Sequence, residues 1–219
     1  KYGSTYSTRA MVQSYPVFAL SLTAIIHYFS TKKWKYLLFI PLFYFIGVNL
    51  FQLHQYNTTV LHSRDMNRLY YASIYLNPSP SPLDMSLLDT DEILRNESDF
   101  NQETISLSNF EKEVIASNSS KGELLTLEIL KNTSWIKVSC SLLSKKGYGS
   151  SYISYSLNDK KKNIRLFNAI SIENEVNKYE FFIKNTEKKQ TNQLGLSLVS
   201  EYEFEGVITD LKVIGYTSK

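Results

Sequence analysis

The chain has 219 residues, 43% of them hydrophobic, a single cysteine and a formal net charge of +3. One cysteine excludes an intramolecular disulfide framework and a cysteine-based zinc site. Only 8 Gly and 5 Pro exclude a collagen-like or Gly/Pro-rich low-complexity chain. The charge is too small to indicate a nucleic-acid partner, for which a basic patch is typical.

Two apolar runs lie near the start of the chain. Residues 10–29 and 36–53 contain no Asp, Glu, Lys or Arg, and a helix of about 20 apolar residues spans a bilayer. The link at 31–35 carries three lysines, which favours the cytoplasmic side. The pattern predicts two transmembrane helices over 10–53 with a cytoplasmic Lys-rich turn, after an extracytoplasmic loop at 1–9.

The alternative for this region is a buried helical hairpin in a soluble protein. Polar residues within the first run, such as Gln13 and His27, are tolerated where a helix packs against other helices. We therefore expect these helices to contact further helices of a longer polytopic parent chain, of which this sequence is the C-terminal piece.

The polarity changes after the second run. Residues 54–76 repeat apolar side chains near every 3.6 positions, which predicts a juxtamembrane amphipathic helix, in one piece or two. Three alternating prolines at Pro78, Pro80 and Pro82 then stop any helix, and six acidic residues follow up to Asp99. We interpret 77–99 as a Pro-rich, acidic surface linker with one short helix.

From residue 100 onward the apolar period is two. In the clearest example, at 135–142, apolar residues occupy alternate positions: Ile136, Val138, Cys140 and Leu142. Seven such segments, with one or two more near 103–107 and 112–116, are separated by turn residues. Strands at this spacing predict an all-β domain over 100–219, an antiparallel β-sandwich of jelly-roll-like form.

Two segments resemble a known family. Residues 2–12 (YGSTYSTRAMV) are similar to a "YGGSFGxRxMV" loop, and residues 49–71 to an "NxxQxxQYxxxILHxxxMxxxYYW" stretch, near the end of large bacterial membrane proteins of the GT-C glycosyltransferase type. Residues 206–213 resemble the family's closing strand pattern. The chain departs from the family at Ser7, where a glycine is usual, and at Ala72-Ser73, where a tryptophan is usual.

The resemblance implies a function and a location. Such enzymes take sugars from lipid-phosphate donors in the bacterial inner membrane, and many end in an extracytoplasmic sandwich that looks like a carbohydrate-binding module. Their acidic catalytic residue lies in the first extracytoplasmic loop, so this segment would carry no complete active site. The implied partners are the lipid bilayer, a polyprenyl-phosphate sugar, glycan and the remaining helices of the parent chain.

A few residues are candidates for binding. Arg9 lies at the outer mouth of the first helix and could hold a donor phosphate, although a contact with lipid headgroups is the simpler alternative. Aromatic rings can stack on the C–H faces of sugars, and four in the β domain are candidates unless they belong to the core or to ordinary surface: Trp135, Tyr148, Tyr152 and Tyr202.

The sequence argues against chemistry in the β domain itself. Residues 100–219 contain no histidine, the commonest general base, and no metal site or cofactor is expected. Two hypotheses remain. The first is an integral membrane glycosyltransferase-like protein whose sandwich binds glycan or caps the catalytic mouth. The second is a non-enzymatic membrane-anchored sandwich for protein interaction or envelope assembly.

Overall fold

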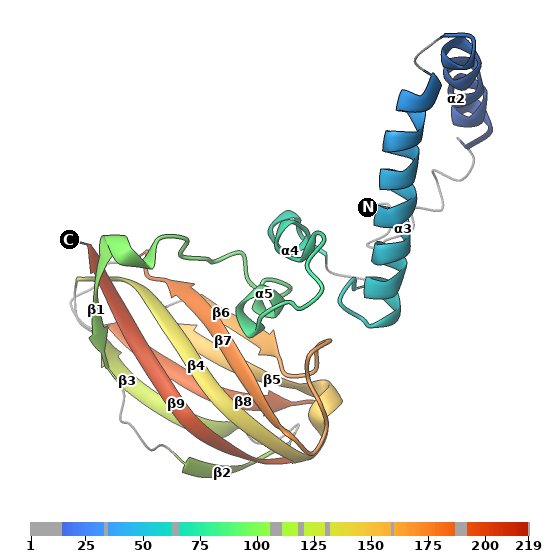
Figure 1. The fold of residues 1–219 in the computed structure, drawn as a ribbon. Helices are drawn as coiled ribbons and strands as arrows, with labels where there is room; N and C mark the ends of the chain where they lie inside the picture. The colour runs from blue at the N-terminus through green and yellow to red at the C-terminus, as the bar shows by residue number, and fades with distance from the viewer. Residues whose placement is uncertain are drawn as a thin grey trace. The chain divides into compact units, whose positions relative to one another are not determined.

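A computed structural model describes residues 15–32, 35–62, 66–105, 111–117, 121–129, 132–158, 160–186 and 192–218. The chain divides into two compact units. Lys1–Met66 with Ile74–Pro78 forms the first, and Asn67–Ser73 with Ser79–Lys219 forms the second. The first is helical and the second is mostly antiparallel sheet (Figure 1).

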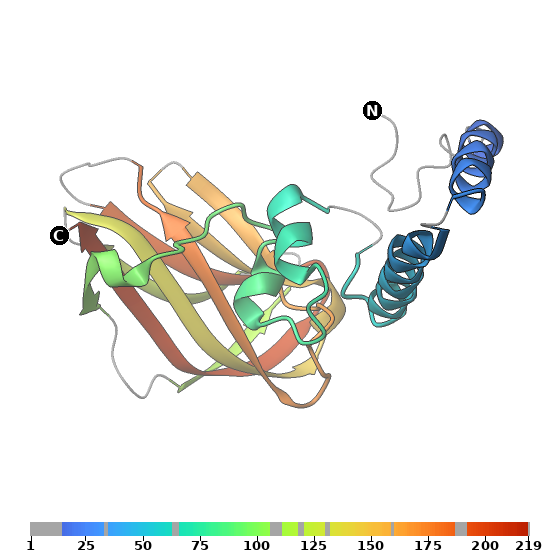
Figure 2. The same cartoon turned by 45° about the horizontal axis from the view of Figure 1, so that its top comes forward.

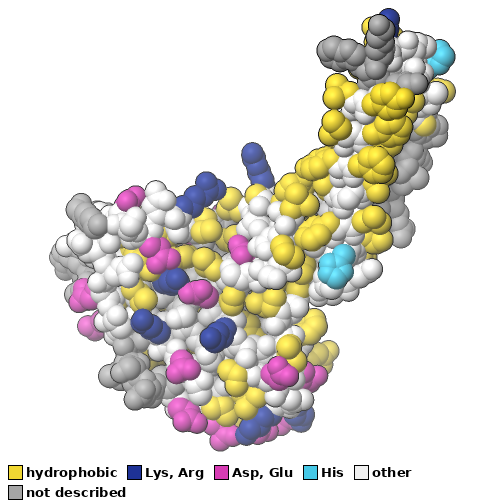
Figure 3. All heavy atoms as spheres, in the orientation of Figure 1, with side chains coloured by type: hydrophobic (Ala, Val, Ile, Leu, Met, Phe, Trp, Pro, Cys, Tyr) yellow, Lys and Arg dark blue, Asp and Glu magenta, His cyan; other side chains and the backbone are white. Residues whose placement is uncertain are grey.

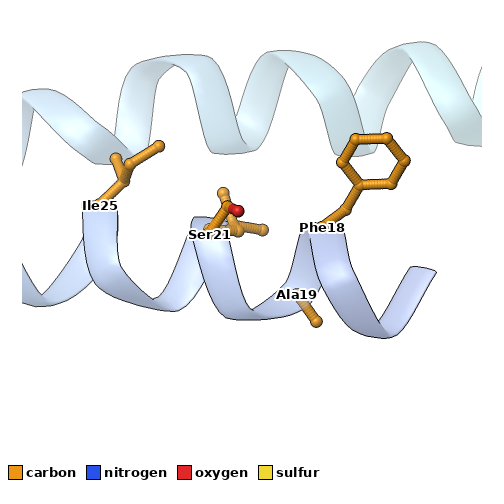
Figure 4. A pocket seen from close by; sticks show the side chains of 5 residues that line it. Phe18, Ala19, Ser21 and Ile25 are labelled. Atoms are coloured by element: carbon orange, nitrogen blue, oxygen red, sulfur yellow. The ribbon is translucent and has the colours of Figure 1, made fainter. Parts of the chain in front are cut away.

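The helical unit contains α2 (Tyr15–Ser30), a 3-10 turn at Lys35–Leu38 and α3 (Phe39–Asn57). Large apolar side chains are exposed on both helices, as the yellow atoms of Figure 3 show. They project in several directions, since Phe18 and Ile25 leave α2 on one side and Ala19 on another (Figure 4). Exposed apolar side chains therefore surround much of α2 and α3.

The buried residue of α3 is, by contrast, polar. Gln55 donates from Nε2 to the carbonyl oxygens of Ile74 (2.7 Å) and Asn77 (3.1 Å). The hydroxyl groups of Tyr44 and Tyr75 also lie 2.9 Å apart. These bonds attach residues 74–78 to α3 within the helical unit.

The expected pair of membrane spans over 10–53 requires correction. Among the described residues, no helix is both long enough and apolar enough to cross a membrane. The helix α2 has 16 residues, and residues 10–14 of the predicted run lie outside the described part of the chain. The 19-residue α3 starts only after the 3-10 turn. Its second half therefore includes four polar residues, Asn49, Gln52, His54 and Gln55, which lower its mean hydropathy.

Residues 54–76 do not form one amphipathic helix. The first four belong to α3, and the next described helix is α4 (Arg68–Ile74). The predicted short helix in the linker is confirmed as α5 (Pro82–Ser86). Ser81 caps it, because its hydroxyl accepts from the Asp84 N–H while Asp84 accepts from the Ser81 N–H.

The second unit confirms an antiparallel sandwich. One sheet has the order β1-β9-β4-β7, with β2 also paired to β9, and the other has the order β3-β8-β5-β6. Every pairing is antiparallel. The strands are β1 (Phe100–Thr104), β2 (Glu111–Ala116), β3 (Gly122–Ile129), β4 (Thr133–Lys146), β5 (Ser151–Leu157), β6 (Lys160–Arg165), β7 (Val176–Lys184), β8 (Asn192–Ser200) and β9 (Phe204–Ser218).

The sandwich core follows the alternation in the sequence. Ile136, Val138, Cys140 and Leu142 of β4 are buried and face the second sheet, as predicted. Successive side chains of a strand point to opposite faces, so one apolar set of period two supplies one wall of the core. Cys140 packs in this core as a small apolar residue. Its burial raises the pKa of the thiol to about 12, so the thiol stays protonated.

Residues 79–99, which we call the strap, lie against the sandwich and are not a free linker. In Figures 1 and 2 the green strap runs past the β6 and β7 side of the sandwich. Its Leu94 is buried with Phe182 and Tyr216 on the outer face of the β1-β9-β4-β7 sheet. The strap therefore covers a second, smaller apolar cluster outside the main core.

The acidic residues of the strap bind the two edge strands. Asp89 accepts from the Arg165 guanidinium at 2.7 Å and from the Arg165 backbone N–H at 2.8 Å on β6. Glu92 accepts from the backbone N–H of Lys184 on β7 at 2.7 Å. Exposed edge N–H groups invite pairing with another chain, and the strap removes two of them.

Candidate functional site

Three connections meet at one end of the sandwich. They join β4 to β5, β6 to β7 and β8 to β9, and we call residues 147–150, 166–175 and 201–203 the aromatic end. Two of them are in direct contact, since the Glu201 N–H donates to the Ser150 carbonyl oxygen at 3.2 Å. Gly147 has φ +77°, and a Cβ there would lie 2.1 Å from the Glu203 carbonyl oxygen, so only glycine permits this approach.

Tyr148 is the buried support of this end. Its hydroxyl bonds the Tyr179 hydroxyl, which itself donates to the Leu166 carbonyl oxygen at 2.8 Å. Because the Tyr179 hydroxyl donates its hydrogen to the Leu166 carbonyl oxygen, the Tyr148 hydroxyl is the donor in the Tyr–Tyr bond. Burial raises the pKa of Tyr148, which keeps that donor protonated. The proposed sugar-stacking role of Tyr148 is therefore wrong, because the ring is inside the protein.

The β6–β7 connection is held in one shape by its own side chains. The Ser171 hydroxyl donates to the Leu166 carbonyl oxygen at 2.9 Å. Asn177, only 7% exposed, accepts from the Ile172 N–H and donates to the Ile172 carbonyl oxygen, both at 2.7 Å. These bonds fix the loop on the sandwich, so the side chains it presents have defined positions.

This loop presents Phe167 to the solvent. The Phe167 ring is 53% exposed and meets the Tyr148 ring edge-to-face, with centroids 6.0 Å apart. Sequence analysis missed Phe167, because it follows the alternating Ile164 and Leu166 and looks like the end of a strand. Because the loop is held in place by its own hydrogen bonds, the exposed face of this ring is a candidate binding surface.

Two predicted residues lie at the same end. Tyr202, in the β8–β9 connection, is 70% exposed. Tyr152 is half-buried on β5, where its cross-strand neighbours are Val199 and Arg165. Those neighbours come shortly before Tyr202 and Phe167 in the chain, so the pairing of β5 with β6 and β8 brings all three rings to one end.

Trp135 lies elsewhere, at the opposite end of β4. It packs edge-to-face on Phe182 with centroids 6.4 Å apart, and the Lys184 ammonium lies 5.5 Å from its ring centroid. Trp135 thus packs against the apolar cluster under the strap, away from the other predicted rings, and its role in sugar binding stays a prediction. Arg9 lies outside the described residues.

The charges around the aromatic end are mixed. Glu203 forms an ion pair with Lys146 at 2.5 Å, and Glu173, Glu175 and Glu201 are exposed nearby in the chain. Among the residues that the structure describes, no group of three His, Cys, Asp or Glu could hold a metal ion. The end offers aromatic faces in a weakly acidic setting, which suits an uncharged ligand with C–H faces.

Comparison with known proteins gives no family. No family model matches the chain, and no curated protein does. Among solved structures, the chain is similar to a protein of infectious bursal disease virus Gt strain, with 10% identity, a TM-score of 0.34, and coverage of 54% of this chain and 38% of that chain.

Two further structures are similar over a comparable region. One is the EclA C-terminal domain, a sugar-binding protein, with 16% identity, a TM-score of 0.32, and coverage of 68% of this chain and 98% of that chain. The other is dimeric latent PorU from Porphyromonas gingivalis, with 12% identity, a TM-score of 0.29, and coverage of 52% and 13%. The chain spans 38% of the Gt-strain protein and 31% of a similar protein of infectious bursal disease virus Gx strain. No argument rests on TM-scores this low.

Proposed function

We propose that the sandwich is a glycan-binding module and that its aromatic end is the binding site. The exposed Phe167 ring, held on a hydrogen-bonded loop at the same end of the sandwich as Tyr202, is the observation that carries this proposal. Aromatic rings supply large, rigid contact areas at a small cost in conformational entropy. The weakly acidic setting disfavours an anionic ligand and leaves a neutral saccharide as the best fit.

We further propose that the chain is the C-terminal part of an integral membrane glycosyltransferase-like protein. The apolar, outward-facing side chains of α2 and α3 support a place in lipid or among other helices of the parent chain. Neither helix contains Asp, Glu, Lys or Arg. The motifs at 2–12 and 49–71 support the same parent, in which the sandwich would be extracytoplasmic and would bind glycan or cap the catalytic mouth.

The strand order supports the finer description of the sandwich as a jelly roll. In both sheets, strands from the start of the domain alternate with strands from its end, as in β1-β9-β4-β7 and β3-β8-β5-β6. Double-sheet jelly rolls occur in lectin and capsid domains alike, so the fold by itself does not choose a ligand.

Binding of saccharides by the full chain in detergent micelles tests the glycan proposal. A panel of immobilised neutral and acidic oligosaccharides is probed with the wild type, Phe167→Ala, Tyr202→Ala and the control Ile172→Ala. Ile172 has the same exposure as Phe167 on the same loop but no ring. We expect saturable binding of a neutral saccharide that each ring deletion weakens about tenfold, because covering an aromatic ring contributes about 1.5–3 kcal/mol when complete.

The opposite results are equally informative. Equal losses in Ile172→Ala and Phe167→Ala would indicate a general apolar contact and favour the non-enzymatic, protein-binding alternative. Failure of the wild type to bind any saccharide on the panel would overturn the glycan proposal.

A further inference from the structure

The outer face of the β3-β8-β5-β6 sheet has a polar hollow away from the aromatic rings. Cross-strand pairing places Thr126 beside Gly195 and Gly195 beside Ser156. The same face carries Gln193 of β8, and Asn158 follows β5 directly. The hollow has a volume of about 490 Å³ and is lined by Thr126, Ser156, Asn158, Gln193 and Gly195.

Two residues of the lining shape it in ways that the strand pattern alone does not require. Gly195 leaves the floor open, because a Cβ there would lie 2.7 Å from the Ser156 hydroxyl oxygen. Asn158 has φ +54°, a left-handed conformation that asparagine tolerates better than most residues. It ends β5 at the rim of the hollow with an amide group that can donate and accept.

The lining selects a type of ligand. Every side chain in it is a hydroxyl or an amide, so donors and acceptors are both present without a charge. Two charged residues lie next to the lining, Lys161 opposite Ser156 and Glu128 opposite Gln193, but they are of opposite sign and provide neither a cationic cluster for an anion nor a carboxylate set for a metal ion. A protein partner would need an aromatic or apolar anchor, which interface hot spots require. A neutral, polyhydroxylated molecule satisfies this set.

The hollow and the aromatic end lie on one face of β5. Tyr152, Ser154 and Ser156 alternate on that outer face, and four residues of a strand extend about 13 Å. Ser154, halfway between, is only 2% exposed, so neighbouring side chains form the surface there. The distance exceeds one sugar ring, and a single monosaccharide would not reach both places.

We propose that the hollow is a second saccharide subsite, and that it binds the continuation of a neutral glycan chain whose other part lies at the aromatic end. This inference rests on the proposed glycan-binding function. It changes the expected ligand from a chain end or single sugar to an extended, uncharged polymer of several units.

Chain-length dependence tests the second subsite. The full chain in detergent micelles is titrated calorimetrically with maltose and maltohexaose, and with the dimer and hexamer of β-1,4-linked N-acetylglucosamine. The variants are Asn158→Gly, which keeps the positive φ and deletes the amide, and Gln193→Ala. The control Gln102→Ala changes an exposed amide on β1 of the other sheet, away from both proposed subsites.

We expect the wild type to bind a hexamer at least tenfold more tightly than the matching dimer. Asn158→Gly and Gln193→Ala are expected to reduce hexamer affinity about tenfold each while leaving dimer affinity unchanged, and Gln102→Ala is expected to match the wild type. Equal affinity for dimer and hexamer, or hollow variants that bind the hexamer like the wild type, would overturn the second subsite.

The two proposals fail in different ways. Loss of all binding in Phe167→Ala with no effect of the hollow variants leaves the aromatic end and removes the hollow. Loss of hexamer binding in the hollow variants with no effect of Phe167→Ala does the reverse. Absence of binding to any of the four saccharides overturns both proposals.

Discussion

The helices α2 and α3 and the strap both precede the strands, yet they are opposites in composition and in burial. The helices contain no Asp, Glu, Lys or Arg and expose large apolar side chains. The strap carries six acidic residues from Asp84 to Asp99 and nevertheless buries Met85, Leu87, Leu88 and Leu94. Among the residues that the structure describes, most apolar side chains of α2 and α3 are uncovered, whereas the strap is packed.

The difference shows that composition indicates which kind of partner the side chains of a segment require. Tertiary contacts decide whether that partner is present. The strap is packed because β6 carries basic side chains that pair with it. Lys162 donates to Asp91 at 3.0 Å and lowers the pKa of the Asp91 carboxyl group. Glu97 likewise accepts from the Tyr216 hydroxyl at 2.6 Å. The helices have no such complement in the described residues of their unit, which is why we assign them a lipid or helical environment.

The largest effect is expected beneath the strap. Phe182 is fully buried in the cluster that holds Leu94 and Tyr216, so Phe182→Ala leaves a cavity there. We expect the free energy of unfolding to fall by about 3–5 kcal/mol. Urea unfolding followed by Trp135 fluorescence measures it, in a Trp34→Phe background that leaves one of the two tryptophans. A change below about 1 kcal/mol would mean that the strap does not cover Phe182 in solution.

The next effect concerns the helices. Under the proposed membrane environment, Phe43, 68% exposed near the start of α3, faces lipid, and a lysine in the apolar core of a bilayer costs up to about 2.5–3.5 kcal/mol. Phe43→Lys should therefore reduce co-flotation of the full chain with phosphatidylcholine vesicles about 100-fold. Thr31→Lys, beside Lys32 in the turn, is the matched control and should float like the wild type. Unchanged flotation of Phe43→Lys would contradict a lipid environment for α3.

A smaller effect is expected at the ion pair that fastens the strap. Asp89→Ala removes the partner of Arg165 and of its backbone N–H, with side chains only 10% and 19% exposed. Hydrogen bonds to charged groups contribute about 1.5–3 kcal/mol, so urea unfolding should reveal a loss of that size. Glu203→Ala breaks the solvent-exposed pair with Lys146 and should leave the urea midpoint unchanged. Equal midpoints for the two variants would show that Asp89 does not fasten the strap.

Much of the sandwich could be predicted because strands are encoded locally. The alternation at 135–142 identified β4 and its buried face, and the same signal located β5, β7 and β8. The bounds of β1 and the extent of α3 could not be predicted from the sequence. The first depends on pairing with the distant β9, and the second on where a 3-10 turn gives way to an α-helix.

The binding residues were harder to predict than the strands. Tyr148 and Tyr202 are both tyrosines in turns, but one is buried on Tyr179 and the other is exposed. Phe167 looked like a strand residue, and the hollow around Gly195 arises only when β3, β8 and β5 pair in this register. Nothing near these positions in the sequence distinguishes the alternatives.

The sequence by itself determined the class of the β domain, its inward-facing residues and the apolar character of the helices, because each depends on side-chain chemistry and a period along one segment. Tertiary structure decided which aromatic rings reach solvent, how the acidic strap is held, and where the polar hollow forms. Those features join residues such as Asp89 and Arg165, 76 positions apart, and depend on the distances that folding creates.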